Sequence, residues 1–339
     1  MAGGIGSRFW PLSIPELPKQ FIDILGCGRT MIQLTVDRFR GICPDDNFWV
    51  VTNAQYVEIV RKQLPMIPSH HILAEPAARN TAPCIAWACW SIQSEDDEAN
   101  VVVTPADAAV MNPEEFRRVI TYALHYTESN DAIVTIGIKP SRPETGYGYV
   151  ELDESKDEGI FSVKEFKEKP DLATAKEYLA SGKYLWNAGI FVWNVATIIE
   201  CISTNKPNIA AAMEQIIETG DVDNIFPTCE KISIDYAVME PESKRGRVCT
   251  CPADFGWSDL GNWASLHDKL QHDNDNNAIV GNVRMYDCRN CTVHVEDADL
   301  VVIQGLNGYI VSEKNGRILI CRHSEEQRIK EWSVPQKGN

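Results

Sequence analysis

The first twenty residues gather the groups that a polyphosphate ligand needs. Gly3, Gly4 and Gly6 permit a tight turn and a close approach of the backbone to a ligand, because glycine has no Cβ atom. Successive backbone N–H groups in such a turn form a concave anion site. Arg8 can donate to two phosphate oxygens at once, and Lys19 adds a mobile point charge. These residues predict a phosphate-binding loop, whereas the glycines alone would also suit an ordinary turn.

The spacing differs from two common phosphate-binding motifs. A P-loop has Lys-Ser or Lys-Thr directly after its last glycine, but Ser7 and Arg8 follow Gly6 here. A dinucleotide-binding fingerprint needs a third glycine at position 9, which is Phe9. The loop therefore belongs to another class of phosphate site.

Two aspartates far apart in the sequence predict a metal site. The apolar run at 100–104 indicates a strand buried on both faces, and it delivers Asp107 to the sheet edge where open α/β folds bind their ligands. Asp107 is not needed to cap the next helix, because Asn112 and Pro113 can start it. Asp259 lies in a glycine-bounded loop and would by itself be an ordinary loop carboxylate. Together the two carboxylates predict a site for Mg²⁺.

A third polar stretch joins a short strand to a helix that extends to about residue 93. Asn80 or Thr81 can cap this helix, and a helix start is a sufficient explanation of the stretch by itself. Glu75, Arg79 and Asn80 could also read the edge of a nucleobase. A carboxylate accepts both the N1–H and N2–H donors of guanine, whereas uracil offers a single imino donor. The residues alone favour the helix start.

These stretches resemble the motifs of the sugar-1-phosphate nucleotidyltransferases, and their form is similar to that of the mannose-1-phosphate guanylyltransferases. The start resembles GGxGxRxWPLS followed by PKQF, and the later stretches resemble EPxxRNTAP, PADH, EKP and SIDYAxME. The resemblance extends from Gly3 to about Ile329, with its motifs in the family's order. One departure is Ala108, which replaces the histidine of PADH and removes any role of that side chain, but leaves Asp107.

The resemblance implies a role for each matching position. Lys169 would reach the sugar phosphate, although it could also be a solvated charge. Gly148 would approach the sugar ring, although a β-bulge would explain the glycine equally well. Asn187 and Asp235 would also face the sugar. The residues implied to bind the nucleotide are Gly3, Gly4, Gly6, Glu75, Arg79, Asn80 and Thr81.

The reaction implied by the resemblance is transfer of GMP from GTP to mannose 1-phosphate. A phosphate oxygen of the sugar phosphate would attack the α-phosphorus in line, with Mg²⁺ neutralising charge and pyrophosphate leaving. Two alternatives remain: a related transferase that uses another nucleotide or sugar phosphate, and a catalytically silent regulator that binds a sugar nucleotide.

The elements that must position these residues predict an α/β fold. Strands and helices alternate as far as residue 138, which indicates a Rossmann-like, mostly parallel sheet with helices on both faces. After a polar break at 274–277, short β-rich segments predict a β-roll or β-helix that ends in a helix at about 325–332. We therefore predict a catalytic domain at 1–275 and a β-rich domain at 276–339. The β-rich domain is expected to serve packing and subunit contact, in a homodimer.

The chain starts unusually close to its glycine loop. Only Met1 and Ala2 precede the glycines, whereas a loop of this kind normally follows a buried strand. Either an N-terminal strand is missing and the start is an internal methionine, or the sheet is completed differently. The resemblance favours the first, so we expect a missing strand. This short start and Ala108 are the features that motivate the silent alternative.

The bulk composition limits the class of partner. The 339 residues carry a net charge of −16, which disfavours nonspecific binding to nucleic acid or an anionic membrane. No apolar run reaches membrane-spanning length. The 11 cysteines have no small-scaffold framework and indicate reduced thiols in a cytoplasmic protein. The pairs Cys249/Cys251 and Cys288/Cys291 lack a standard zinc spacing.

Overall fold

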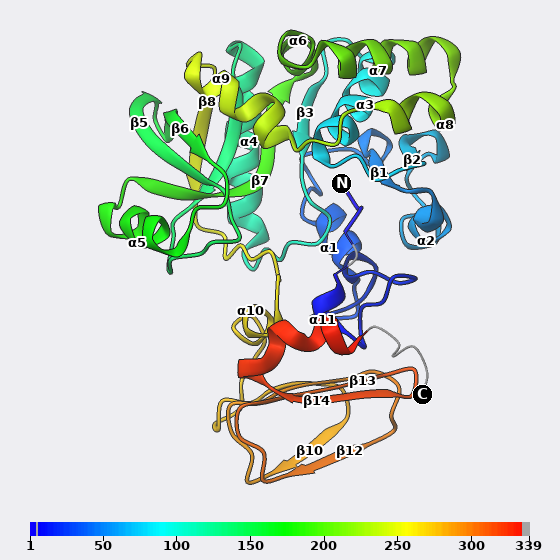
Figure 1. Ribbon diagram of the computed structural model, residues 1–339, viewed down its shortest axis with the longest axis vertical. Helices are drawn as coiled ribbons and strands as arrows, with labels where there is room; N and C mark the ends of the chain where they lie inside the picture. The colour runs from blue at the N-terminus through cyan, green and yellow to red at the C-terminus, as the bar shows by residue number, and fades with distance from the viewer. Residues whose placement is uncertain (5, 334–339) are drawn as a thin grey trace. The chain divides into compact units, whose positions relative to one another are not determined.

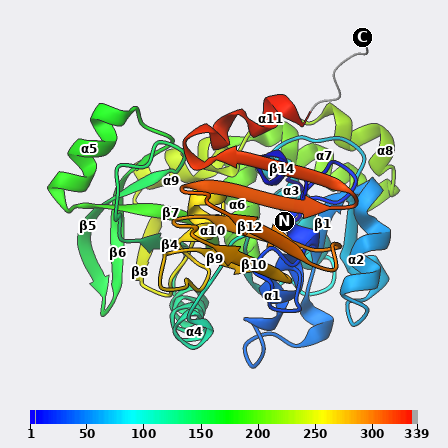
Figure 2. The same cartoon turned by 90° about the horizontal axis from the view of Figure 1, so that it is seen from below.

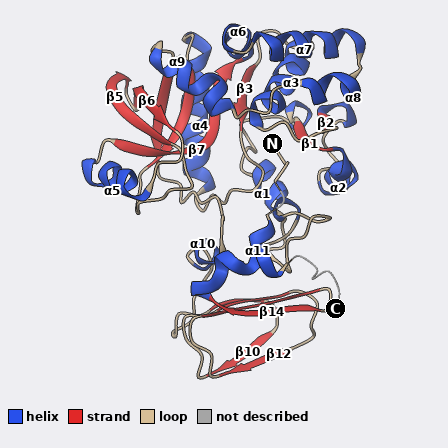
Figure 3. Cartoon of the chain, in the orientation of Figure 1, coloured by secondary structure: helices blue, strands red, loops and turns tan. Residues whose placement is uncertain are grey.

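The computed structural model describes residues 1–4 and 6–333, which divide into two compact units (Figures 1 and 3). The first, here called the sheet unit, contains residues 1–3, 38–105 and 112–257. The second, here called the β-helix unit, contains residues 4–37, 106–111 and those from 258 onward.

The sheet unit is built on a six-stranded sheet. In spatial order its strands are β3 (Asn100–Val103), β7 (Tyr184–Asn194), β4 (Ile133–Ile138), β8 (Val248–Ala253), β6 (Ile160–Lys167) and β5 (Tyr149–Asp157). β4 and β8 are parallel, whereas β7 runs antiparallel to both β3 and β4. The α/β class is confirmed, but the sheet is mixed rather than mostly parallel. The reason is that the β5–β6 hairpin and α5 intervene after β4, and the chain returns as β7 in the opposite direction.

Helices cover both faces of this sheet, as the alternation of strands and helices predicts. On one face, α3, α6 and α7 form a core with Phe191 and Trp193 of β7. Ile190 and Val192 alternate with these residues and therefore point to the other face, where α4 packs against β7 (Figure 2). The helices of the unit are α2 (Val57–Gln63), α3 (Thr81–Gln93), α4 (Pro113–Ser129), α5 (Leu172–Ser181), α6 (Val195–Asn205), α7 (Pro207–Thr219), α8 (Val222–Ile225) and α9 (Glu240–Lys244).

A smaller parallel pair extends the sheet unit. β1 (Val50–Asn53) pairs with β2 (Ile72–Glu75). Ala2 forms a parallel bridge with Thr52, and its N–H donates to the carbonyl of Val51 at 2.9 Å. The Met1 amino group donates to the carbonyl of Thr104 at 3.0 Å. The two residues before the glycines are thus bonded to β1 and to the end of β3, which fixes the position of Gly3.

The β-helix unit confirms the strand-rich region predicted near the end of the chain. β9 (Ala278–Val280), β11 (Thr292–Val295) and β13 (Tyr309–Lys314) pair in parallel, and β14 (Arg317–Arg322) closes this sheet antiparallel to β13. β10 (Val283–Tyr286) and β12 (Val301–Gln304) form a second parallel pair. These stacked parallel coils are those of a β-helix, and α11 (Ile329–Trp332) follows them.

One apolar core joins the early residues of the β-helix unit to its coils. Phe9 and Leu12 from the start of the chain share this core with Trp263, Ile310 and Leu319. α1 (Met31–Asp37) and α10 (Trp263–His267) contribute to the same core. The domain boundary predicted between residues 275 and 276 stays a prediction, and this core contains residues from both sides of it.

Among the described residues, no helix combines the length and the apolar character required to span a bilayer.

Candidate active site

The glycine loop in the β-helix unit requires glycine at position 6. Gly6 has a φ of +61°, and a Cβ added there would lie 2.8 Å from Cβ of Lys19 and 3.0 Å from Oγ of Ser13. The side-chain amide of Gln20 donates to the carbonyl of Gly4 at 3.0 Å and holds the loop from the other side. Sequence reasoning gave Gln20 no role, although it lies inside the PKQF motif.

Lys19 is a buried, fixed cation rather than the mobile charge that its type suggests. Its side chain is 6% exposed and forms an ion pair with Oδ2 of Asp107 at 3.0 Å. Its ammonium group also donates to the carbonyls of Asp259 at 2.6 Å and Leu260 at 3.1 Å. Lys19 therefore contacts the Asp107 carboxylate and the backbone of the loop that carries Asp259.

The segments that carry Asp107 and Asp259 are joined by backbone pairing. The N–H of Ala109 donates to the carbonyl of Ser258 at 2.7 Å, and the reverse bond is 3.1 Å long. Oδ1 of Asp259 accepts the N–H of Gly261 at 3.0 Å, and a Cβ at Gly261 would lie 2.7 Å from Oδ2 of Asp259. Carboxylate oxygens are the ligands that a hard divalent cation prefers, so this donor set fits such an ion.

Arg8 lies beside the Asp259 loop. Its guanidinium donates to the carbonyl of Gly261 at 3.2 Å and is otherwise exposed. Its own carbonyl accepts the indole N–H of Trp263 at 3.0 Å, which anchors the backbone beneath an accessible cation. The predicted residues that the β-helix unit brings together are Gly4, Gly6, Arg8, Lys19, Asp107 and Asp259.

Glu75 ends β2 as a buried carboxylate in the sheet unit. Burial raises its pKa to about 7. Its Oε1 has no hydrogen-bond partner among the described residues, and Oε2 lies 4.0 Å from the position of a Cβ on Gly3. A buried acceptor beside a glycine is the environment expected for a group that receives N–H donors from a ligand.

The other predicted residues of this loop make structural contacts. Asn80 caps α3, and its side-chain oxygen accepts the N–H of Thr81 at 2.8 Å. Oγ1 of Thr81 accepts the N–H of Ile234 at 2.9 Å, which ties the loop to the segment that precedes Asp235. Arg79 donates to the carbonyl of Pro227 and is thereby engaged with the backbone.

Asn187 is the centre of the predicted sugar-binding cluster. Its Oδ1 accepts from the hydroxyl of Thr135 at 2.8 Å and from the N–H of Gly189 at 3.0 Å, while its Nδ2 donates to Oδ1 of Asp235 at 3.2 Å. Its backbone N–H donates to the carbonyl of Gly148 at 2.8 Å. The structure thus brings Gly148, Asn187 and Asp235 together.

Glu168 belongs to this cluster, although sequence reasoning assigned it no role. A Cβ at Gly148 would lie 2.8 Å from Oε2 of Glu168, and Oε1 pairs with Nζ of Lys169 at 2.5 Å. This pairing raises the pKa of Lys169. Burial, with the Glu168 charge second, raises the pKa of Asp235 to about 6. The sequence signal for Glu168 was its neighbour Lys169, because a lysine predicted to lie near Asp235 can also pair with the glutamate that precedes it.

Strained backbone occurs in the loop after β2, in the segment after β6 and in the loop that carries Asp259. Asn80 has φ 67° and ψ −171°, a region occupied almost only by glycine. Lys169 and Leu260 both have a φ of +44°. Among the described residues, these two are the only positive-φ positions that are not Gly, Asn or Asp. Asp235 begins a π-helical turn at Asp235–Met239, a feature frequent at functional sites.

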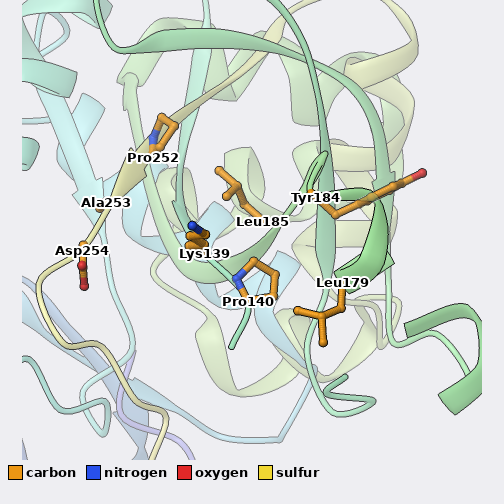
Figure 4. A pocket seen from close by; sticks show the side chains of 9 residues that line it. Lys139, Pro140, Leu179, Tyr184, Leu185, Pro252, Ala253 and Asp254 are labelled. Carbon is orange, nitrogen blue, oxygen red and sulfur yellow. The ribbon is translucent and has the colours of Figure 1, made fainter. Parts of the chain in front are cut away.

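A pocket of about 350 Å³ lies elsewhere in the sheet unit (Figure 4). Lys139, Pro140, Leu185 and Pro252 surround it, with Tyr184 and Leu179 at its side. It contains none of the predicted site residues.

Comparisons with known proteins identify the family of the chain. Residues 1–276 match the protein family described as Nucleotidyl transferase. The chain belongs to this family and is a nucleotidyltransferase, which confirms the resemblance seen in the motifs.

Individual relatives narrow the comparison. The chain is 37% identical to "Mannose-1-phosphate guanylyltransferase ManC" of Salmonella typhimurium, covering 97% of this chain and 71% of the relative. It is 36% identical to "Alginate biosynthesis protein AlgA" of Pseudomonas aeruginosa, over 97% of this chain and 70% of the relative. Among solved structures, a "mannose-1-phosphate geranyltransferase" of Thermus thermophilus has a TM-score of 0.89 at 30% identity, over 98% of this chain and 96% of that chain.

Proposed function

We propose that the chain transfers GMP from GTP to mannose 1-phosphate and releases GDP-mannose and pyrophosphate. The observation that carries this proposal is the buried Lys19, which is bonded to Asp107, Asp259 and Leu260 beside the glycine loop. A fixed cation, a glycine turn and two carboxylates supply what phosphoryl transfer requires, namely charge neutralisation and alignment. Relatives named for mannose-1-phosphate guanylyltransfer support the choice of sugar and base.

Nucleotidyltransferases generally use a divalent metal ion, and we propose Mg²⁺ held by Asp107 and Asp259. Such an ion would neutralise phosphate oxygens as charge develops on them. The N–H groups of Gly3, Gly4 and Gly6, with Arg8 and Lys19, hold the triphosphate and the departing pyrophosphate. A phosphate oxygen of the sugar phosphate forms the new bond to the α-phosphorus while the bond to the bridging pyrophosphate oxygen breaks.

The remaining predicted residues select the substrates. Glu75 accepts the N–H donors of guanine, with Arg79, Asn80 and Thr81 maintaining the loop around it. Lys169 neutralises the attacking phosphate. Gly148, Asn187 and Asp235 face the sugar, and the position of Glu168 supports adding it to this group. The predicted homodimer and cytoplasmic location stay predictions.

The direct test is pyrophosphate release from GTP and Mg²⁺ with mannose 1-phosphate, compared with glucose 1-phosphate and with the other nucleoside triphosphates. We expect release that depends on mannose 1-phosphate, GTP and the metal. Asp107→Asn and Asp259→Asn should each lower kcat by at least about 100-fold, a typical cost of removing one electrostatic element of a site. Near-normal turnover of both variants at saturating Mg²⁺ would contradict the metal assignment, and equal rates with glucose 1-phosphate the sugar assignment.

A further inference from the structure

Two histidines and a glutamate form a cluster in the sheet unit that the proposed reaction does not use. His70 and His71 end a short 3₁₀ helix immediately before β2, and Glu95 follows the end of α3. One ligand atom from each residue lies within 4.8 Å of the others. It is the only group of three or more such side chains within ligand reach in the part of the chain that the structure describes. The cysteine pairs form no such group there.

The spacing of the donor atoms suits a metal ion with nitrogen and oxygen ligands. Nε2 of His71 lies 3.2 Å from Oε2 of Glu95, and Nε2 of His70 lies 3.6 Å from Oε1 of the same carboxylate. Ligands bound at zinc distances in a tetrahedron are about 3.3 Å apart, which falls between these two separations. Both His–Glu separations therefore suit a shared ion, and all three donor atoms lie within 4.8 Å of one another.

One of the three ligands is already held in place. His71 is 5% exposed, and its ring stacks on Trp49 with centroids 3.8 Å apart. Nδ1 of His71 has no hydrogen-bond partner among the described residues, so stacking and Glu95 set the orientation of the ring. His70 is largely exposed and leaves one side of the cluster open to solvent. A buried, oriented imidazole beside an accessible one provides both a rigid ligand and an entry path.

We propose that His70, His71 and Glu95 bind one divalent transition-metal ion such as Zn²⁺, with water completing its coordination. Imidazole nitrogen selects Zn²⁺, Ni²⁺ or Cu²⁺ over Mg²⁺, which prefers oxygen ligands. The ion fastens the start of β2 to the end of α3. The opposite ends of these two elements carry Glu75 and Asn80, so the site clamps the strand and the helix that hold the nucleobase loop.

The test is Zn²⁺ binding to the full chain, measured by competition with a chromophoric chelator in excess Mg²⁺ and a non-thiol reductant. Excess Mg²⁺ occupies sites that have oxygen ligands only. Zn²⁺ bound by free thiols is the same in every variant, so it cancels when the variants are compared. His70→Gln and Glu95→Gln alter exposed ligands and spare the buried His71. Because loss of even an outer-shell partner weakens metal binding roughly 10- to 100-fold, each variant should lose affinity by at least about tenfold for one equivalent of Zn²⁺.

The chain offers a matched control in an exposed histidine–glutamate pair on α4. Nδ1 of His125 lies 3.2 Å from Oε2 of Glu128, and this pair is not part of a three-residue cluster among the described residues. His125→Gln should keep the wild-type stoichiometry and affinity. Equal Zn²⁺ binding by wild type, His70→Gln and Glu95→Gln would overturn the proposal, as would no binding by the wild type.

A second readout uses the indole that stacks on His71. Ni²⁺ bound at the cluster should quench Trp49 fluorescence, and Trp49→Phe should remove that component without changing the metal stoichiometry. Quenching of the same size in His70→Gln would place the metal elsewhere and contradict the proposal. Neither measurement depends on turnover, so the site can fail while the proposed reaction holds, and the reverse.

Discussion

At the scale of single residues, the site depends on charged groups taken out of water. Lys19 is buried with three oxygen partners, so its charge is compensated before any ligand arrives. Glu75 is different, because it is buried with one oxygen unpaired among the described residues. Burial raises the pKa of Glu75 to about 7, so its ionised form is costly until a donor pairs with it.

This difference predicts a pH-dependent affinity for the guanine-bearing product. If Glu75 accepts guanine N–H donors, as proposed, they favour its ionised form, so binding should be full above the free-protein pKa of about 7 and be lost as pH falls below it. The Kd for GDP-mannose should be about tenfold higher at pH 6 than at pH 8, because each pH unit below a pKa costs a factor of ten. Calorimetric titration measures this, and GDP-mannose has no phosphate that titrates in the range.

The variant Glu75→Gln provides the comparison. It should weaken binding at pH 8 and lose most of the dependence between pH 6 and pH 8. An unchanged slope in this variant would assign the titration to another group, such as Asp235, whose pKa is raised to about 6.

Residue types were predictable at this scale, but their environments were not. The glycines, Lys19 and the two aspartates could be selected because few chemistries require that combination. The burial of Lys19 could not be predicted, since the carbonyls that fix it come from residues 259 and 260, which lie 240 and 241 positions away in sequence. Glu168 was missed because its importance comes from contact with Gly148 rather than from local pattern.

At the scale of elements, loops hold Gly6, Asp107 and Asp259. Gly6 shapes the loop before a 3₁₀ turn at Ser7–Phe9 and packs directly on Lys19. A side chain at this position would meet two obstacles, the positive φ and the crowding against Lys19. The loop and the buried cation therefore behave as one structural piece.

We predict that Gly6→Ala removes activity by displacing Lys19. The positive φ costs a non-glycine residue roughly 1–2 kcal/mol, and the added methyl carbon would lie 2.8 Å from Cβ of Lys19. Steady-state kinetics should show a fall in kcat/KM of at least about 100-fold, the typical effect of misplacing a catalytic group by an ångström.

Gly28→Ala is the control for backbone strain alone. Gly28 has a φ of +80°, yet a Cβ there meets nothing within 4 Å. Gly28→Ala should lower the melting temperature by about as much as the backbone strain of Gly6→Ala does, while keeping kcat/KM near wild type. Near-normal activity of Gly6→Ala would mean that the loop adapts and that Lys19 is not coupled to it.

Element type was easier to predict than element direction. The apolar runs at 100–104 and 132–138 and the capped helix after Asn80 are present as strands and helix because local pattern determines them. The direction of β7 depends on how the chain returns from the β5–β6 hairpin, which is a tertiary property. The sheet was therefore predicted as more parallel than it is.

At the scale of the whole molecule, one apolar core connects the first residues of the β-helix unit to its last coil. Phe9 ends the 3₁₀ turn that follows the glycine loop, and Leu12 lies just after this turn. Both residues share a core with Ile310 and Leu319 of the β-helix. The β-helix is therefore part of the support of that loop. A catalytic segment that ends at residue 275 would leave this core exposed.

This shared core predicts an effect of the β-helix on catalysis. Leu319→Ala empties a site that is 5% exposed and should lower the free energy of unfolding by about 2–5 kcal/mol. We also expect a raised KM for GTP, because Phe9 and Leu12 lose part of their support. Chemical denaturation and steady-state kinetics measure the two effects.

The neighbouring Ile318→Ala is the matched control, because Ile318 lies on the same strand and is 64% exposed. It should change neither quantity appreciably. If Leu319→Ala destabilised the protein but left the KM for GTP unchanged, the coil and the loop would be independent despite their common core.

The strained backbone at Asn80, Lys169 and Leu260 has a consequence for how such a protein can evolve. Glycine at any of these positions would relax the chain by roughly 1–3 kcal/mol. The same exchange would remove the Asn80 cap or the Lys169 ammonium, and at Leu260 it would delete a fully buried side chain. At Lys169, whose ammonium is proposed to neutralise the attacking phosphate, selection for thermal tolerance and selection for turnover therefore act in opposite directions. A lineage that adapts to heat has to gain its stability elsewhere in the molecule.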